Sequence, residues 1–358
     1  MRNKSYYIFL LQFLPLLLLC SALSCSSVRV SRNQPFQLDK SHSIVLCDST
    51  KAAELIITDN TDNFFGKITQ TDMCLQMKKN FGPEYGPNDI SDAFLTFLQK
   101  DVTNFSSDEM SLMVKIMKEA KKLCDKVSPS VFPANIQLIK VRSRNYGNSV
   151  YYTRENCIVI PENELKSKGY DGLLSVMLHE VFHVYSRLNP EKRAQLYELI
   201  GFRHLEQNAA LEIPEPLKSQ ILLNPDGSDI RYCINLKLED GNEVKAIPII
   251  YSKTPAFDPK QPAFFKYMSF ELFEIKPIAR GYAVQINKDG SSSRSLIKGS
   301  DFYKQIRDNT GYIIHPDEIM ADNFMFLMLR EKDAIRFGKF SKEGKELIAQ
   351  LEQLLKSK

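Results

Sequence analysis

The chain contains an H-E-x-x-H motif, formed by His179, Glu180 and His183. In an α-helix, residues i and i+4 lie on one face about 6 Å apart along the axis, so the two imidazoles could bind one metal ion. Glu180 would lie beside that ion, where its carboxylate could take a proton from water and pass it to a leaving amine. A chain of this length and composition would contain the motif by chance with a probability of roughly half a per cent, so we treat it as a functional signal.

The residues around this motif predict the helix that it requires. Gly169–Gly172 supplies a helix breaker and, at Asp171, a candidate N-cap, and Asn189–Pro190 ends the apolar pattern. In the alternative interpretation, the two histidines are structural residues of an apolar helix. Because most of their neighbours are apolar, two imidazoles without a metal ion would need polar partners there, so we favour the metal site.

A catalytic zinc site of this kind needs a third protein ligand and an open position for water. Position 189, where a third histidine would follow soon after the motif, holds asparagine. Three carboxylates come after the motif, at Glu198, Glu206 and Glu212, and we keep the first two as reserve ligands.

A stronger candidate for the third ligand lies in the segment His315–Asp322. Pro316, followed by two acidic residues, is typical of the first turn of a helix. In that helix Glu318 and Asp322 would lie one turn apart on one face. Glu318 could then bind the metal while Asp322 accepts a hydrogen bond from a ligating imidazole and so fixes its tautomer.

H-E-x-x-H followed by E-x-x-x-D resembles the gluzincins, the thermolysin-like clan of zinc metallopeptidases. The stretch from Glu318 to Asp322 is most similar to the E-x-x-A-D of the prenyl-protein peptidase family. The resemblance covers two helices, and it implies His179, His183 and Glu318 as zinc ligands, Glu180 as general base and Asp322 as the residue behind a ligand. His183 and Glu318 are farther apart in this sequence than the corresponding residues of thermolysin, and the additional membrane spans of the prenyl-protein peptidases are absent.

A peptidase of this class also needs a hydrogen-bond donor for the oxyanion that develops on the scissile carbonyl. His315 and Tyr312 are the first candidates by position. Other side chains are candidates by position, and the sequence does not choose among them: Tyr303, Tyr282 and His204.

The first residues are typical of an export signal. A basic start, an apolar run and small residues before Cys25 predict a signal peptide over residues 1–24. Ordinary cleavage before Cys25 is one interpretation, and the same site resembles a bacterial lipoprotein signal in which Cys25 carries the lipid. An uncleaved anchor is the weaker alternative, because Gln12 and Pro15 interrupt the run. We expect an exported protein, either a cell-envelope lipoprotein or a secreted one, with residues 25–42 as a polar tether.

Composition excludes some partners. The chain has 47 basic and 43 acidic side chains, and signal removal would take two basic ones, Arg2 and Lys4, so the near balance does not favour nucleic acid. No long apolar run follows the signal, so we expect membrane contact only through a lipid on Cys25. The remaining cysteines form no C-x-x-C pair, which argues against a cysteine-ligated metal, and export favours one or two disulfides.

Periodicity predicts an α+β fold, with a zincin-like body over residues 43–225, a β-rich insertion over 226–298 and a helical segment over 299–358. Helices are expected near 89–98, 106–123 and 191–208. Within the β-rich insertion, 232–238 and 244–251 are expected to form one hairpin, and 282–286 and 294–297 another. A strand at 135–142 and a hairpin of 149–153 with 156–161 come directly before the metal helix. We expect the last of these to be a sheet edge, along which an extended peptide could pair and lie across the metal.

The sequence therefore predicts a Zn²⁺-dependent metallopeptidase acting on a peptide or protein substrate. Zinc would polarise the scissile carbonyl and activate water, with Glu180 as general base. One alternative is a non-catalytic envelope lipoprotein or binding module with a structural or vestigial metal site. Another is a zinc amidase acting on cell-wall or small amide bonds. Glu180 favours an enzyme, because a purely structural site needs no base and usually closes its fourth position with protein.

Overall fold

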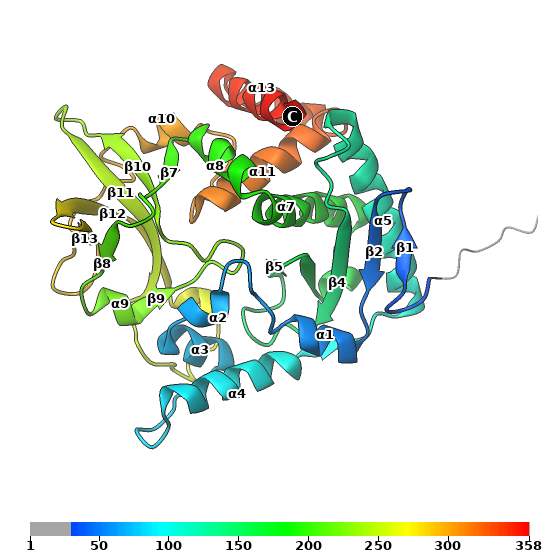
Figure 1. Ribbon diagram of the computed structural model, residues 1–358, viewed down its shortest axis with the longest axis horizontal. Coiled ribbons are helices and arrows are strands. Elements are labelled where there is room, and N and C mark those ends of the chain that lie inside the picture. The colour runs from blue at the N-terminus through cyan, green and yellow to red at the C-terminus, as the bar shows by residue number, and fades with distance from the viewer. Residues whose placement is uncertain (1–29, 358) are drawn as a thin grey trace, which may run out of the picture.

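The computed structural model describes residues 30–357 and has an α+β fold with two β-sheets (Figure 1). The first sheet has the order β1-β2-β4-β6-β5, with β3 paired to β4. Its strands are β1 (Pro35–Gln37), β2 (Ser43–Leu46), β3 (Val102–Thr103), β4 (Asn135–Val141), β5 (Tyr152–Arg154) and β6 (Cys157–Pro161). β2, β4 and β6 run parallel, whereas β1 and β5 are antiparallel to their neighbours.

The second sheet, on the left of Figure 1, is almost entirely antiparallel. Its order is β7-β10-β11-β12-β13-β8, with β9 paired to β11 and a parallel pair formed by β13 and β8. Its strands are β7 (Phe202–His204), β8 (Ala210–Glu212), β9 (Ile221–Leu222), β10 (Tyr232–Lys237), β11 (Glu243–Ser252), β12 (Met268–Ile278) and β13 (Gly281–Val284).

Helices surround the first sheet and fill the space between the two sheets. The first five in chain order are α1 (Ser49–Leu55), α2 (Phe64–Lys67), α3 (Gln70–Met77), α4 (Pro87–Gln99) and α5 (Ser107–Val127). The rest are α6 (Glu164–Ser167), α7 (Tyr170–Leu188), α8 (Pro190–Glu198), α9 (Leu217–Gln220), the 3-10 turn η1 (Phe264–Lys266), α10 (Phe302–Ile306), α11 (Pro316–Leu329), α12 (Ala334–Gly338) and α13 (Lys342–Lys356).

The first sheet is buried on both faces, which explains the apolar character of β4 and β6. Side chains alternate between the faces of a strand. Ile136 and Leu138 of β4 therefore join the core formed with α5 and α7, whereas Ile139 and Val141 join the core formed with α1 and α4. This packing holds the start of α7 against the sheet.

Helix α7, which carries the H-E-x-x-H motif, is largely buried because it packs on α5, α8 and α11. Its N-cap is Gly169, and Asp171, the expected cap, lies inside the first turn. Asn189 ends the helix, as expected. α13 packs on α11 from the other side, so α11 is covered by apolar contacts from both neighbours.

The expected helix over 191–208 is too long. α8 ends at Glu198, and Phe202–His204 forms β7, which pairs with β10. Gly201 makes the reversal possible, because its φ of +81° is a conformation that other residues rarely adopt. The strand itself results from pairing with a segment about thirty residues later, a long-range contact that overrides helical propensity.

The expectation that residues 156–161 form a sheet edge is also wrong. β6 lies between β4 and β5, and the edge strand is β5. β6 forms the predicted hairpin with β5, but its other side pairs in parallel with β4. The order of strands depends on contacts between distant segments, which the local pattern of the hairpin does not contain.

The second sheet includes the hairpin expected after residue 229, observed as β10 and β11. It begins earlier than the boundary at 226, because β7, β8 and β9 belong to it. β12, which was not expected, pairs along most of β11, and residues 294–297, expected as a strand, contain none. β13 therefore pairs with β12 and not with residues 294–297, the partner that the sequence suggested.

Five cysteines lie within residues 30–357, and all five are free: Cys47, Cys74, Cys124, Cys157 and Cys233. The expected disulfides are therefore not formed among them. Residues 1–24, expected to form a signal peptide, and Cys25 lie outside the described residues. Within 30–357, no helix combines the length and the apolar character needed to cross a membrane.

Candidate metal centre

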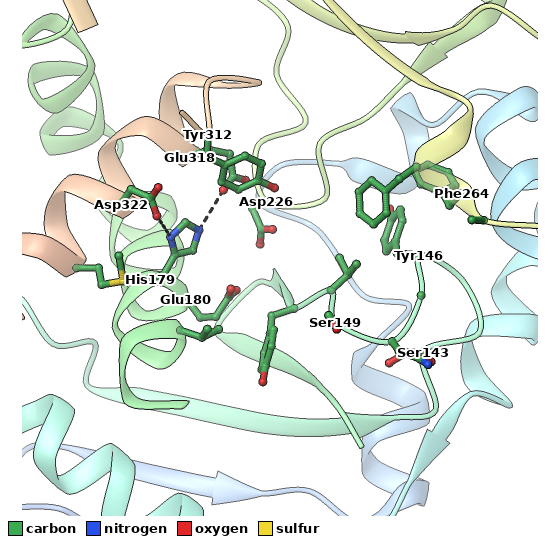
Figure 2. Close-up of a pocket in the computed structure, with 18 of the residues that line it drawn as sticks. Ser143, Tyr146, Ser149, His179, Glu180, Asp226, Phe264, Tyr312, Glu318 and Asp322 are labelled. Atoms are coloured by element: carbon green, nitrogen blue, oxygen red, sulfur yellow. Dashed lines mark hydrogen bonds and ion pairs between the residues drawn. The ribbon is translucent and has the colours of Figure 1, made fainter. Parts of the chain in front are cut away.

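The two histidines of the motif and Glu318 meet where α7 packs against α11. Figure 2 shows His179 with its partners Glu318 and Asp322. The imidazole rings of His179 and His183 lie 4.7 Å apart, one helical turn from each other. Glu318 Oε2 lies 3.1 Å from Nε2 of His179 and 3.5 Å from Nε2 of His183. Three potential ligand atoms from two helices therefore converge on one point.

This arrangement fits a divalent metal ion. Ligand atoms about 2.1 Å from zinc at the corners of a tetrahedron are roughly 3.4 Å apart, close to the separations observed here. Within the described part of the chain, His183 Nε2 and Glu180 Oε2 are buried and have no hydrogen-bond partner. Buried polar atoms without partners are rare, and a cation between them removes the cost of their burial.

Each imidazole is held from behind by a carboxylate. Nδ1 of His179 donates to Asp322 Oδ1 at 3.0 Å, as the sequence predicted. Nδ1 of His183 donates to Asp317 Oδ2 at 2.6 Å, and Asp317 was not among the expected site residues. Such carboxylate–histidine pairs direct Nε2 toward a metal and fix its tautomer.

Asp317 is itself fixed by neighbouring helices. Its Oδ1 accepts hydrogen bonds from the hydroxyls of Ser186 on α7 and Tyr197 on α8. The sequence contains a signal for it, because Asp317 directly precedes Glu318, but the local pattern indicates only the start of a helix. Its role depends on α7 and α8 packing on the same turn of α11.

Glu318 is oriented by a residue in a connection between two strands of the second sheet. Asn224, between β9 and β10, donates through Nδ2 to Glu318 Oε1 at 2.8 Å. Thr310 similarly donates to Oδ2 of Asp322. The other oxygen of each carboxylate, Oε2 of Glu318 and Oδ1 of Asp322, is thus left to face the imidazoles.

The electrostatics of the cluster follow from burial and pairing. Burial lowers the pKa of His179, but bonds with Asp322 and Glu318 outweigh this effect and raise the pKa to about 10. Burial raises the pKa of Glu318, yet the charge of His183 and the histidine hydrogen bonds outweigh it and hold the pKa well below its usual value. The imidazoles therefore hold protons that a metal ion would displace.

Glu180 lies beside the ligand cluster and faces a cavity of about 800 Å³. Only 3% of the residue is exposed. Burial, reinforced by the negative charge of Asp226, raises the pKa of Glu180 to about 8. A carboxyl group of that pKa can both accept and donate a proton near neutral pH.

The cavity extends from Glu180 toward an aromatic wall (Figure 2). Tyr312 stacks on His179, with ring centroids 6.2 Å apart and planes at 24°. The wall opposite includes residues of the loop before β5 and of the turn before β12: Tyr146, Val150, Tyr151, Phe264 and Phe265. The cavity can therefore hold an extended ligand with apolar groups.

His315 does not line this cavity, so the prediction that it donates to an oxyanion does not fit its position. Its Nδ1 accepts the N–H of Asp317 at 3.1 Å, and its Nε2 donates to the Asp229 carbonyl at 3.3 Å. It is the N-cap of α11. Of the two first candidates, Tyr312 alone faces the cavity.

The other expected candidates lie elsewhere. Glu198 is exposed and pairs with Arg203 at 3.4 Å, and Glu206 and Glu212 are also on the surface. None of these carboxylates lines the cavity, so none can serve as the third ligand. The other possible oxyanion donors also lie outside it: Tyr303, Tyr282 and His204.

Asp226 is a cavity residue that sequence reasoning missed. It lies in the connection between β9 and β10 and is only 6% exposed. One of its oxygens is within 4.8 Å of the potential ligand atoms of His183 and Glu318. No motif surrounds it in the sequence, so only the folding of the second sheet against α7 identifies it.

No protein-family model, curated protein or solved structure matches this chain. The function is therefore inferred from the site itself.

Proposed function

We propose that this chain is a zinc-dependent metallopeptidase with His179, His183 and Glu318 as its metal ligands. The convergence of these three side chains on one point, with Glu180 beside it, is the observation that carries the proposal. Two imidazoles and a carboxylate are a set that suits zinc, and when bound the ion would polarise the scissile carbonyl and lower the pKa of water.

The protein's own residues would supply the remaining chemistry. Glu180 takes a proton from the attacking water and passes it to the leaving amine. Asp317 and Asp322 keep each imidazole in the tautomer that presents Nε2. Tyr312 is the candidate donor to the oxyanion, because it lines the cavity and stacks on His179.

The shape of the site supports a peptide or protein substrate. The cavity of about 800 Å³ is large enough for several residues, and it lies beside β5, the edge strand of the first sheet. A mixed sheet with an antiparallel edge strand next to the H-E-x-x-H helix also supports a zincin-like body. Export by the signal at 1–24, with a lipid on Cys25, remains part of the proposal.

The amidase alternative would use the same metal ligands and the same general base, Glu180. The binding-module alternative would use the metal ligands without Glu180. Glu180 separates the enzymes from the binding module, since its carboxylate faces the cavity and has an oxygen without a partner within residues 30–357. A metal that only stabilised the fold would have no need of it.

The test combines metal analysis with hydrolysis of a broad peptide library by the purified mature chain. We expect one zinc per chain in wild type, loss of most of it in Glu318→Ala, and retention in Glu180→Gln with hydrolysis reduced on the order of 10²–10⁴-fold. A metal-free wild type, or a Glu180→Gln variant as active as wild type, would contradict the proposal. Metal binding without hydrolysis of any peptide would favour the binding module. Hydrolysis of small amides but not of peptides would favour the amidase.

A further inference from the structure

The segment from Asn224 to Asp226 connects the second sheet to the metal centre. Asn224 donates to Glu318, and Asp226 lines the cavity beside Glu180. The segment is tightly packed, since a Cβ on Gly227 would lie 2.4 Å from the ring of His315. Residues between β9 and β10 therefore hold a fixed position relative to α7 and α11.

The carboxylate of Asp226 is anchored on one side only. Its Oδ1 accepts the backbone N–H of Thr153 at 2.5 Å and the Thr153 hydroxyl at 2.7 Å. Arg187 supports both residues, because it donates to the Thr153 hydroxyl at 2.8 Å and to the Asp226 carbonyl at 3.1 Å. The anchors use one oxygen and leave the other to the cavity, on the side that Glu180 also faces (Figure 2).

A buried carboxylate without a cation is costly, and Asp226 has no such partner in the described residues. Arg187 reaches its carbonyl oxygen and directs the guanidinium Nε to Asp62 at 2.7 Å. His183 forms its ion pairs with Asp317 and Glu318.

The position of Asp226 suits a water molecule better than a direct bond to the ion. An oxygen of Asp226 is within 4.8 Å of the ligand atoms of His183 and Glu318, yet it forms no ion pair with the imidazole. Gaps longer than a hydrogen bond between polar groups are commonly bridged by water. Glu180 borders the same space from α7.

We propose that Asp226 is a positioning residue that, together with Glu180, holds the water molecule that attacks the substrate. The inference rests on the proposed function. Each carboxylate accepts one hydrogen of the water, so the oxygen lone pair is directed toward the scissile carbonyl. Fixing an attacking group in this way lowers the entropic part of the barrier. The first sheet, through Thr153, and the second sheet, through residues 224–226, would thus jointly orient the nucleophile.

The test compares Asp226→Asn, Asp226→Ala and Asp229→Asn with wild type, each loaded with zinc or with Co²⁺. The amide oxygen of Asp226→Asn can still accept both Thr153 bonds, so this variant keeps the anchor and loses the charge. Asp229, on the same segment, is partly exposed, pairs with His204 and serves as the matched control. The readouts are kcat and KM on a peptide substrate, the visible spectrum of the Co²⁺ forms and thermal unfolding of the metal-free chains.

We expect Asp226→Asn to lower kcat roughly 10–100-fold with little change in KM, the range seen for residues that support a metal site. Its Co²⁺ spectrum should differ from wild type, because the donors around the ion rearrange. Its metal-free form should unfold no earlier than wild type, and Asp229→Asn should match wild type throughout.

Two outcomes overturn the inference in different ways. If wild type hydrolyses peptides and Asp226→Asn has the same kcat and Co²⁺ spectrum while Asp226→Ala is impaired, Asp226 is only a structural anchor and the proposed function stands. If wild type and Asp229→Asn bind no metal, the inference and the proposed function fail together.

Discussion

Asp317 accepts a hydrogen bond from Nδ1 of His183 at 2.6 Å, across the packed faces of α11 and α7. Glu318, the next residue, approaches Nε2 of the same ring. Two consecutive residues of α11 thus contact opposite edges of one imidazole, so a small displacement of α11 would disturb both contacts of His183.

Removal of the Asp317 carboxylate should weaken metal binding. We expect Asp317→Asn to lower metal affinity about 10–100-fold, because the His183 tautomer and ring orientation lose their support. Competition with a chelator measures the affinity. Asp308→Asn, a surface variant in the loop before α11 that bonds Ser341, is the control and should bind as wild type does. Equal affinities in all three proteins would show that Asp317 does not act on the metal site.

Metal affinity should rise with pH. The pKa of His179 is raised to about 10 and that of His183 is also raised, so both imidazoles are protonated in the metal-free protein at neutral pH. Metal binding requires their neutral forms and must release protons. Calorimetry between about pH 6 and about pH 8, in buffers of different ionisation enthalpy, should show tighter binding at the higher pH and proton release at each. Affinity independent of pH would contradict this prediction.

The contact of α13 with α11 should depend on the charge of Glu352. Hydrogen bonds and charges from Arg330 and Lys356 outweigh partial burial and lower the pKa of Glu352 to about 2. The pKa is lower in the folded state than the usual glutamate value of 4.5, so the stabilisation is present above that value and is lost as the pH falls toward 2.

Glu352→Gln should therefore reduce the free energy of unfolding at neutral pH and approach wild type as the solution becomes acidic. Denaturant unfolding at several pH values measures the difference. Glu346→Gln, on the same helix but exposed and 3.7 Å from Lys342, is the matched control and should change stability little. A constant difference between Glu352→Gln and wild type at every pH would exclude the charge as its cause.

The two aromatic residues of η1 should have separable roles. Phe264 is 4% exposed, so Phe264→Ala should cost about 3–5 kcal/mol of stability. Phe265 is 50% exposed and lines the cavity. Phe265→Ala should leave stability unchanged and raise KM several-fold for peptides with a bulky apolar residue. Tyr303→Ala, equally exposed but outside the cavity, is the control, and an unchanged KM for Phe265→Ala would remove Phe265 from substrate binding.

The parts of the site predicted from the sequence are those with local geometry. His179 and His183 are four residues apart in one helix, and so are Glu318 and Asp322, and a helix places such pairs on one face whatever surrounds it. The helix start at Pro316 and the end of α7 at Asn189 likewise depend on neighbouring residues. The α+β class follows from the same short-range periodicity.

Tertiary structure alone decided which distant side chains join them. Asp226 and Asn224 reach the centre because a second sheet folds against α7 and α11, and His315 caps a helix instead of facing the cavity. For the same reason, the edge strand of the first sheet is β5 and not β6, which the sequence predicted. These features depend on contacts between segments far apart in the chain. Such segments pair because their apolar surfaces become buried together, and the local sequence pattern of either segment does not predict this pairing.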